Sequence, residues 1–267
     1  MITYRQIVNG LHELGIQRHY PVIAHTSTEN LREIKGGAEV LLGGLLAAAD
    51  NLLLPAFTYG TMITPETGPE ENAVEYGSGR ETNLNAKIFT PDLPSDMPEH
   101  ELCEKFRALP KVRRSNHPIL SFVGLGLNAA LEAQSCEQPW EPIQYLADNE
   151  GWVLLLGVDQ TQNISLHWAE QQVGRKQFVR WALTPSGATE CRNFPGCPDG
   201  FNKLQYYVKN LLHQISFDSI LWQAYPLQPL INAAMDLMKQ DPYALLCNSL
   251  PCERCNAVRR AVRNRPA

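Results

Sequence analysis

The sequence predicts an α/β fold, with a mixed central sheet, helices on both of its faces and a single domain. Short apolar runs that are typical of strands alternate along the chain with segments whose apolar residues recur at helical spacing. One run, residues 151–158, is apolar throughout, which indicates a central strand covered on both faces. Strands that alternate with helices are typical of a sheet between two layers of helices, so the two observations indicate this class.

Each element is assigned from the same two patterns. Ile7, Leu11 and Leu14 recur at spacings of four and three, and Thr3 is suited to cap the start of this helix. A short apolar run at residues 21–24 predicts a buried strand. On these grounds we expect helices over residues 3–14, 36–49, 98–108, 125–134, 143–149, 165–172, 202–213 and 227–239, and strands over residues 21–24, 51–57, 151–158 and 177–183.

No internal repeat or low-complexity linker divides the chain, so we assign residues 1–267 to one domain. Within it, residues 66–96 are rich in Gly, Pro, Asn, Thr and Glu and predict a long irregular loop. Loops of this length in compact domains are usually lids or binding loops, although a disordered insertion would have the same composition. Residues 190–267 are expected to form a C-terminal helical part that carries a cysteine cluster.

The composition limits the classes of function. Of the 267 residues, 44% are hydrophobic and 19% charged, which suits a packed core and argues against disorder. No apolar run approaches the 18 residues of a membrane span, and no charged-then-apolar leader begins the chain, so we expect a cytoplasmic protein. The net charge of −5 argues against nucleic acid as a partner. It suits a cationic small substrate, but it also suits any acidic protein of this size. Whether the chain is a monomer or a dimer is left open.

The first candidate site is the pair His167 and Glu170, which closely follows the predicted central strand. Loops at the carboxyl ends of strands are where α/β proteins place ligands. On a helix the two residues share a face, and a carboxylate beside an imidazole holds one tautomer and stabilises imidazolium. This arrangement suits a general base, although chance His/Glu pairs on helix surfaces are common.

Two further segments have the chemistry of anion-binding loops. Residues 113–121 contain two arginines, hydroxyls and His117, and Arg pairs phosphate oxygens bidentately. Residues 25–28 place Thr26, Ser27 and Thr28 directly after a predicted strand, where hydroxyls and free backbone N–H groups can hold phosphate. Solvated turns would account for either segment equally simply.

The sequence has seven cysteines, which is an odd number, and we expect no secretory leader. Both observations argue against structural disulfides. Cys103 and Cys136 look isolated. Cys252 and Cys255 have the spacing of a zinc knuckle, and Cys197 and Cys247 could complete a tetrahedral thiolate site. The alternatives are free reduced thiols and a redox pair.

The motifs gain specificity when their order along the chain is considered. Neither of the two most specific blocks, Arg-Ser-x-His-Pro and Leu-Gly followed by His-x-x-Glu, would suffice alone. In order, the motifs are His25-Thr26-Ser27, Gly36-Gly37, Pro55-Ala56-Phe57-Thr58-Tyr59, Phe106-Arg107, Arg114-Ser115-Asn116-His117-Pro118 with Ser121, Leu154-Leu155-Leu156-Gly157, and His167 with Glu170.

Together these motifs resemble the aminoglycoside 3-N-acetyltransferase family, over about residues 1–183 and more loosely to the C-terminus. The resemblance implies an enzyme that passes an acetyl group from acetyl-CoA directly to a primary amine, and the acceptor it suggests is the 3-amino group of an aminoglycoside antibiotic. It implies that His167 and Glu170 are catalytic and that Tyr59 and His117 are near the amine. It also implies coenzyme contacts for Thr26, Ser27, Thr28, Arg114, Ser115, Ser121 and Asn163.

The chain departs from the family at three places, one of which is Glu141-Pro142 in place of a Ser-Pro. Ile164 stands where the family usually has a threonine, and an isoleucine side chain cannot donate a hydrogen bond to an oxyanion. Residues 66–85, where substrate contacts are expected, match poorly. Three alternatives therefore stay open: acetylation of another amine in small-molecule biosynthesis, a non-catalytic homologue that binds coenzyme A, and an interaction protein stapled by a structural zinc.

Overall fold

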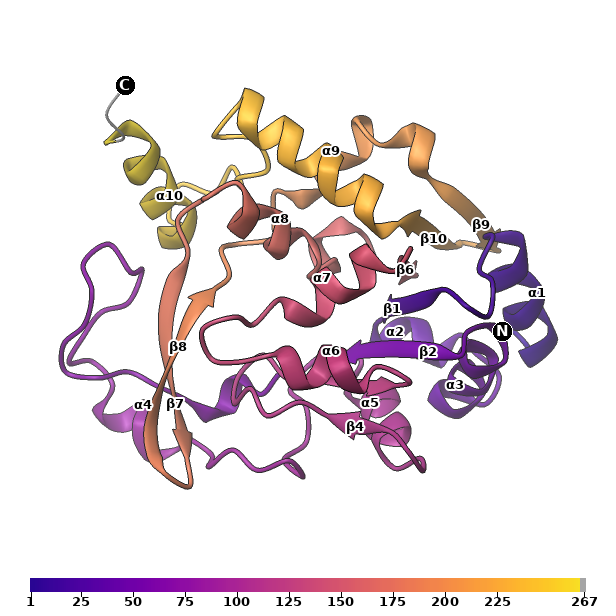
Figure 1. Cartoon of the computed structure of the whole chain (residues 1–267), viewed down its shortest axis with the longest axis horizontal. Coiled ribbons are helices and arrows are strands. Elements are labelled where there is room, and N and C mark those ends of the chain that lie inside the picture. Colours follow the sequence, from indigo (N-terminus) through magenta and orange to yellow (C-terminus); the bar gives the residue numbers. More distant parts are fainter. Residues whose placement is uncertain (265–267) are drawn as a thin grey trace.

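The computed structural model describes residues 1–264 and contains a seven-stranded mixed sheet (Figure 1). Its central strand, β1, is parallel to both of its neighbours, β2 and β6, and every other pairing in the sheet is antiparallel. This confirms the predicted fold class. In spatial order the strands are β4 (Arg113–Arg114), β5 (Phe122–Leu125), β2 (Asn51–Pro55), β1 (Pro21–His25), β6 (Trp152–Leu156), β10 (Ile220–Pro226) and β9 (His213–Phe217).

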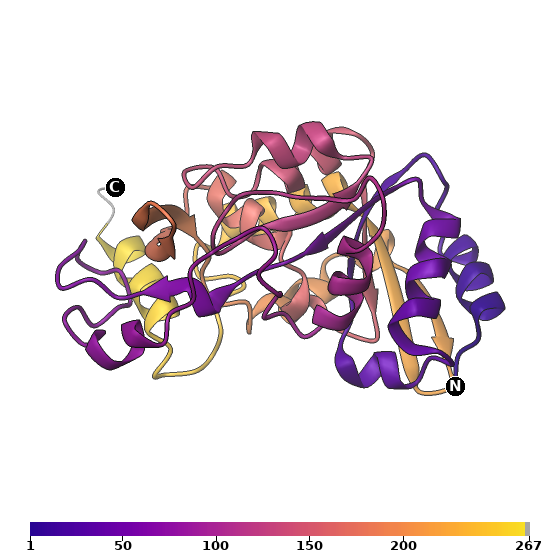
Figure 2. The same cartoon turned by 90° about the horizontal axis from the view of Figure 1, so that it is seen from below.

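Helices cover both faces of this sheet and create two hydrophobic cores (Figure 2). Alternate residues of β6 enter opposite cores, since Trp152 and Leu154 pack in one while Val153 and Leu155 pack in the other. One core is closed by α1 (Tyr4–Glu13), α3 (Gly37–Ala48) and α5 (His100–Arg107), and the other by α6 (Asn128–Ala133), α7 (Glu141–Asp148), α8 (Leu166–Gln172) and α9 (Leu227–Gln240).

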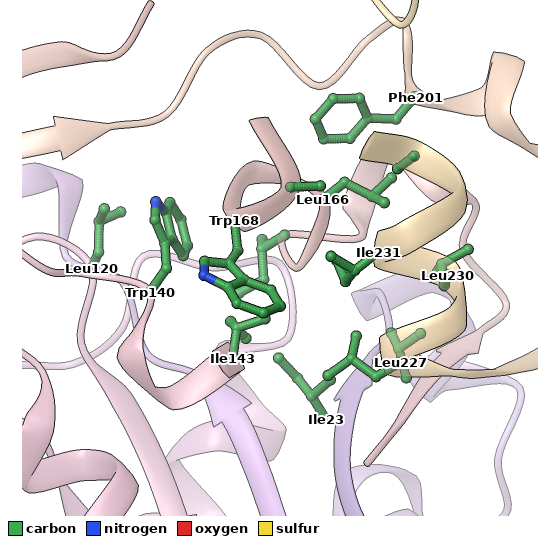
Figure 3. Packing of buried hydrophobic residues seen from close by; sticks show 14 of the residues in the cluster. Ile23, Leu120, Trp140, Ile143, Leu166, Trp168, Phe201, Leu227, Leu230 and Ile231 are labelled. Atoms are coloured by element: carbon green, nitrogen blue, oxygen red, sulfur yellow. The ribbon is translucent and has the colours of Figure 1, made fainter. Parts of the chain in front are cut away.

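The second core fixes the helix that carries the predicted catalytic pair. Trp168 on α8 and Trp140 lie beside Ile143 of α7, and Leu227, Leu230 and Ile231 of α9 face them (Figure 3). Aromatic side chains of this size bury large apolar areas, so α8 is held firmly against α7 and α9.

A second sheet lies at the end of the molecule away from α1 (Figure 1). The irregular segment 66–96, which contains α4 (Arg80–Leu84), is anchored there because Asn72 exchanges two hydrogen bonds with the backbone of Val179 (2.8 and 3.0 Å). Arg260 also pairs with Glu71 of this segment. The second sheet is antiparallel, in the order β3 (Met62–Ile63), β7 (Phe178–Thr184) and β8 (Gly187–Phe194). The two α-helices not yet named are α2 (Thr28–Arg32) and α10 (Glu253–Arg263).

Two expectations about the C-terminal third were wrong. The predicted helix 202–213 is two 3-10 turns, Phe201–Tyr206 and Lys209–Leu211, and β9 begins at its last residue. Residues 190–267 are therefore not simply helical, because β9 and β10 join the large sheet and the end of β8 also lies there. The last three residues of this part, 265–267, lie outside the described residues, and the division into parts stays a prediction. Within residues 1–264 no helix is long and apolar enough to cross a membrane.

Candidate active site

A polar turn between β6 and α8 positions the predicted catalytic helix. Gly157 has a φ of 69°, a conformation that favours glycine, and turns the chain at the end of β6. The Asn163 side chain is fully buried, donates to Gln160 Oε1 (2.9 Å) and accepts from the backbone N–H of Ser165 (3.2 Å). Asn163, expected to contact the coenzyme, thus shapes the turn that begins α8.

His167 and Glu170 lie side by side on α8 as the sequence predicted. His167 Nδ1 is 2.8 Å from Glu170 Oε2, and both side chains are buried. Arg175 Nη1 donates to the other carboxylate oxygen (3.0 Å), while its Nη2 binds the carbonyls of Pro242 and Ala244. Because a carboxylate accepts at Nδ1, the imidazole proton is assigned to that nitrogen, and Nε2 carries a lone pair.

The His167 ring is held between the rings of Trp140 and Phe201, with centroid distances of 5.8 and 4.9 Å. It lines a cavity of about 440 Å³ to which Tyr59 and Ile164 also contribute. Although 38% of Tyr59 is exposed, the protein packed around it raises its pKa to about 12, so its hydroxyl is protonated at neutral pH. The other residues of this His167 cavity are Met62, Met97, Thr161, Gln162, Arg180, Phe194, Pro195, Gly196, Pro198 and Arg254.

Two guanidinium groups, Arg180 and Arg254, give the His167 cavity a positive lining. Arg180 is 9% exposed and lies over the rings of Phe178 and Phe194 (5.5 and 4.9 Å), and burial lowers its pKa to about 10. Within residues 1–264, neither arginine has a carboxylate within 4.0 Å. Because buried charges are normally paired, this wall of the cavity is suited to an anionic group of a ligand.

A second cavity of about 690 Å³ adjoins the first at the carboxyl ends of β1 and β6. The two share Thr161 and Gln162 in their walls. The second cavity is lined by the carboxylates of Glu29, Glu33 and Asp159 and by no Lys or Arg among the described residues. The candidate site therefore consists of two adjoining cavities with linings of opposite charge.

The hydroxyls of residues 26–28, predicted to hold the coenzyme, are engaged within the protein. Thr26 Oγ1 donates to the carbonyl of Leu156 (3.1 Å) and Thr28 Oγ1 to that of Pro98 (2.8 Å). Ser27 accepts from the backbone N–H of Asn30 and caps α2, and of these three residues only Ser27 lines the acidic cavity. Thr26 and Thr28 thus fix the loop, and any coenzyme contact by residues 26–28 stays a prediction.

Arg114 is likewise occupied by neutral partners. Its Nε donates to Ser121 Oγ (3.0 Å) and its Nη2 to the carbonyl of Ala56 (2.8 Å), and Nη1 binds two further backbone carbonyls. Ser115 Oγ accepts from the backbone N–H of Phe122 (2.9 Å). In this structure these side chains tie β4 and β5 to the chain that follows β2. The expected phosphate-binding role of Arg114, Ser115 and Ser121 stays a prediction.

His117, expected near the amine, does not line the cavity that contains His167. Its Nδ1 accepts from the backbone N–H groups of Ile119 and Leu120 (3.1 and 2.9 Å), and the side chain is buried. Burial lowers the pKa of His117 to about 4, so it is neutral in the folded protein at neutral pH. His117 is a structural imidazole that supports the turn before β5.

The cysteines form two groups. Cys197, Cys247, Cys252 and Cys255 converge, with all four Sγ atoms within 4.8 Å of one another. Cys136, which looked isolated in the sequence, lies with its Sγ 3.8 Å from that of Cys191.

Sequence reasoning missed Arg175 and Arg180, and it noted Arg254 only within a basic run over residues 254–265 that a solvated tail would explain. Arg175 follows Glu170 by five residues across a turn, a spacing that gives no helical signal. Arg180 lies on a strand at the far end of the molecule, and Arg254 lies on a helix more than 80 residues beyond His167 in the sequence. The signals in that segment were the Cys-x-x-Cys that encloses Arg254 and the basic run that begins there.

Comparison with known proteins identifies the family. The family model described as aminoglycoside 3-N-acetyltransferase matches residues 23–239, which is most of the chain. The chain belongs to the aminoglycoside 3-N-acetyltransferase family. This is a family of acyltransferases that use acetyl-CoA, so the expected enzyme class is confirmed.

The chain is similar to curated members of this family at modest identity. It is 27% identical over 193 residues to a prophage-derived aminoglycoside N(3')-acetyltransferase-like protein of Bacillus subtilis, covering 66% of this chain and 68% of the relative. It is 29% identical over 195 residues to aminoglycoside N(3)-acetyltransferase IX of Micromonospora chalcea, covering 67% of this chain and 66% of the relative. These alignments therefore span about two thirds of each relative.

A solved structure shares nearly the whole fold. The crystal structure of the aminoglycoside acetyltransferase AAC(3)-IVa apoenzyme superposes with a TM-score of 0.77 at 21% identity. The superposition covers 97% of this chain and 98% of that one, so it includes the C-terminal strands that sequence reasoning missed.

Proposed function

We propose that this protein transfers the acetyl group of acetyl-CoA to a primary amine, with His167 as the general base. The observation that carries the proposal is the buried His167–Glu170 pair on the wall of a cavity, with Nδ1 held by the carboxylate at 2.8 Å. That contact leaves Nε2 as the proton acceptor, which is what an attacking amine requires.

In the proposed reaction the amine nitrogen attacks the thioester carbonyl carbon, and Nε2 of His167 takes a proton from that nitrogen. The C–N bond forms, the C–S bond breaks, and the imidazolium returns its proton to the coenzyme sulfur, which leaves as a thiol. Glu170 stabilises the imidazolium, and Arg175 holds Glu170 in place through its second oxygen (3.0 Å).

The oxyanion of the tetrahedral intermediate needs a hydrogen-bond donor. Ile164 lines the cavity but offers no side-chain donor, and the amide of Asn163 is bonded to Gln160. Ser165 Oγ is buried, has no hydrogen-bond partner within residues 1–264 and lies behind the lining of the cavity, next to Ile164. We propose that Ser165, the neighbouring hydroxyl, provides this donor in place of the family's threonine.

The acceptor we favour is the 3-amino group of an aminoglycoside, and the charges of the two cavities suggest where each substrate binds. A polycationic acceptor is attracted to the lining of Glu29, Glu33 and Asp159, while the phosphates of the coenzyme suit Arg180 and Arg254. The family resemblance implies the reverse placement, with the coenzyme at residues 26–28 and the amine at Tyr59.

A second candidate function follows from that reverse placement. If the amine lies beside Arg180 and Arg254, their positive charge repels a polycation and favours an amine that also carries a carboxylate or phosphate. The protein would then acetylate a biosynthetic amine, and aminoglycosides would be poor substrates.

The reaction is tested by following thiol release from acetyl-CoA with a thiol-reactive dye across a panel of amines. The panel includes aminoglycosides, simple diamines, and amines that carry a carboxylate or phosphate. We expect amine-dependent turnover that is greatest with an aminoglycoside. Thiol release that never exceeds the rate without amine, together with coenzyme binding by calorimetry, would instead indicate a non-catalytic coenzyme-binding homologue.

The placement of the two substrates is tested with Arg254→Gln. Losing a charge-assisted contact worth about 1.5–3 kcal/mol should raise the KM for acetyl-CoA by roughly ten-fold or more, with a smaller change in the KM for the amine. Arg192→Gln, at an exposed arginine paired with Glu190, is the matched control. A selective rise in the KM for the amine would reverse the placement and favour the second candidate function.

A further inference from the structure

Four cysteines from distant parts of the sequence meet behind the His167 cavity. Cys197 follows β8, Cys247 lies in the loop after α9, Cys252 caps the start of α10 and Cys255 lies in the first turn of that helix. All four Sγ atoms lie within 4.8 Å of one another. Three of these side chains are buried and that of Cys252 is partly exposed. We propose that the four cysteines bind a structural zinc ion as thiolates.

The spacing of the sulfur atoms fits this ion. A zinc–sulfur bond of about 2.3 Å in a tetrahedral site places the sulfurs roughly 3.8 Å apart, so the cluster needs a contraction of only about 1 Å. All four cysteines are free thiols, and the partial exposure of Cys252 leaves a route for the metal. Four protein ligands leave no open position, so the site is structural and takes no part in acetyl transfer.

One backbone donor already faces a sulfur of the cluster. The N–H of Cys247 donates to Cys255 Sγ at 3.4 Å. Such N–H donors favour the charged form of a sulfur ligand, and the N-terminus of α10 adds further positive potential beside Cys252.

Cationic side chains surround the cluster. Arg254 Nη1 donates to the carbonyl of Gly196 (2.9 Å), Lys203 Nζ to that of Leu246 (2.7 Å), and Arg259 to that of Cys247. Four thiolates and one zinc ion carry a net charge of −2, which these three cations offset. The three carbonyls belong to the two chain segments that carry Cys197 and Cys247.

The other group of potential ligands does not meet these requirements. His117, Cys136 and Cys191 also bring their ligand atoms within 4.8 Å of one another. However, His117 Nδ1 accepts two backbone N–H bonds, so its Nε2 carries the proton and has no lone pair for a metal. Only two cysteines then remain as potential ligands, so this group serves as an internal control for zinc binding by the four-cysteine cluster.

A metal at the four cysteines would stiffen one wall of the candidate active site. Arg254 lies between Cys252 and Cys255, and Gly196, next to Cys197, also lines the His167 cavity. A Cβ added at Gly196 would lie 3.4 Å from Glu170 Oε2, which shows how closely this segment approaches the catalytic carboxylate. The ion would therefore tie together the end of β8, the loop after α9 and the start of α10.

The test is the zinc content of full-length protein purified without a metal-affinity tag, in reducing buffer and after a wash with chelator. We expect about one zinc per chain, and cobalt(II) substitution should give the visible spectrum of a tetrahedral thiolate site. Cys252→Ser should lose the zinc during the chelator wash, and it should fold because serine is a good helix cap. Cys247→Ser is the second variant, and Cys136→Ser, also partly buried but in the other group, should retain the zinc.

Three results would overturn the proposal. One is fewer than about 0.2 zinc per chain both as purified and after the reduced protein is incubated with zinc and desalted. Another is a full zinc content that Cys252→Ser and Cys247→Ser leave unchanged through the chelator wash. A disulfide within the cluster, detected by mass spectrometry of protein isolated with its thiols blocked, would identify a redox pair instead.

Discussion

His167 and His117 are both buried, and both were assigned to the active site by their motifs, yet the structure gives them opposite properties. His167 Nδ1 faces a carboxylate at 2.8 Å, and its ring borders a cavity. His117 Nδ1 accepts from two backbone N–H groups, and its Nε2 is buried without a partner within residues 1–264. The difference shows that the partners of the two ring nitrogens, more than burial, decide whether a histidine can act as a base.

The largest expected effect separates the two histidines by catalysis. His167→Ala should lower kcat by about 10²–10⁴, because a positioned general base contributes about that much to proton transfer. His117→Asn should change kcat by less than about three-fold, because its lone pair is already used by the backbone. Steady-state thiol release with the best amine measures both. Equal losses of kcat in the two variants would show that the two histidines do not differ in catalysis. A His167→Ala variant with unchanged kcat would show that His167 is not the general base.

The next largest effect concerns His117 and the free energy of unfolding. The pKa of His117 is about 4 in the folded protein against an ordinary value of 6.5, so between these values the unfolded chain binds more protons. The contribution to stability is therefore complete above about pH 6.5 and is lost as the pH falls toward 4, by about 3 kcal/mol in total. Urea unfolding from pH 7.5 to 4.5 should show a smaller loss of stability in His117→Asn than in the unchanged protein. If the free energy of unfolding changed with pH equally in both proteins, His117 would not titrate in this way.

The smallest effect concerns the group that supports Glu170. Arg175→Lys keeps the charge but cannot reach both Glu170 and the carbonyls of Pro242 and Ala244. We expect kcat to fall by about ten-fold with little change in either KM, since a misplaced carboxylate weakens transition-state stabilisation without altering binding. The pH profile of kcat should shift as well. A change in thermal stability alone would show that Arg175 only holds the fold together.

The central strands and most helices were predictable because each carries its own signal. β6 is apolar at every position, and α1 has both a helical apolar stripe and the capping box at Thr3. The C-terminal strands carry weaker signals: β9 is short and partly exposed, and it alternates only loosely. The false helix over 202–213 arose because Leu204, Val208 and Leu211 do recur at helical spacing, but the chain there forms successive 3-10 turns.

The candidate site was only partly predictable, for a related reason. Residues close in sequence, such as His167 and Glu170, could be paired from their spacing on one helix. The roles of Thr26 and Arg114 could not, because a side chain's free donors depend on carbonyls brought near by the fold. The positive lining of the His167 cavity arises from Arg180 and Arg254, which only tertiary structure brings together.

The order of the strands also bears on how the chain folds during synthesis. β6 lies beside the central strand β1, yet its antiparallel neighbour β10 is made some 60 residues later. Until residues 220–226 have left the ribosome, β6 is an exposed strand edge with an apolar sequence, and such edges are templates for aggregation. Chains that stop before β10 should therefore depend on chaperones. Residues 220–226 protect the edge of β6, and α10, which carries Arg254, completes the wall of the site.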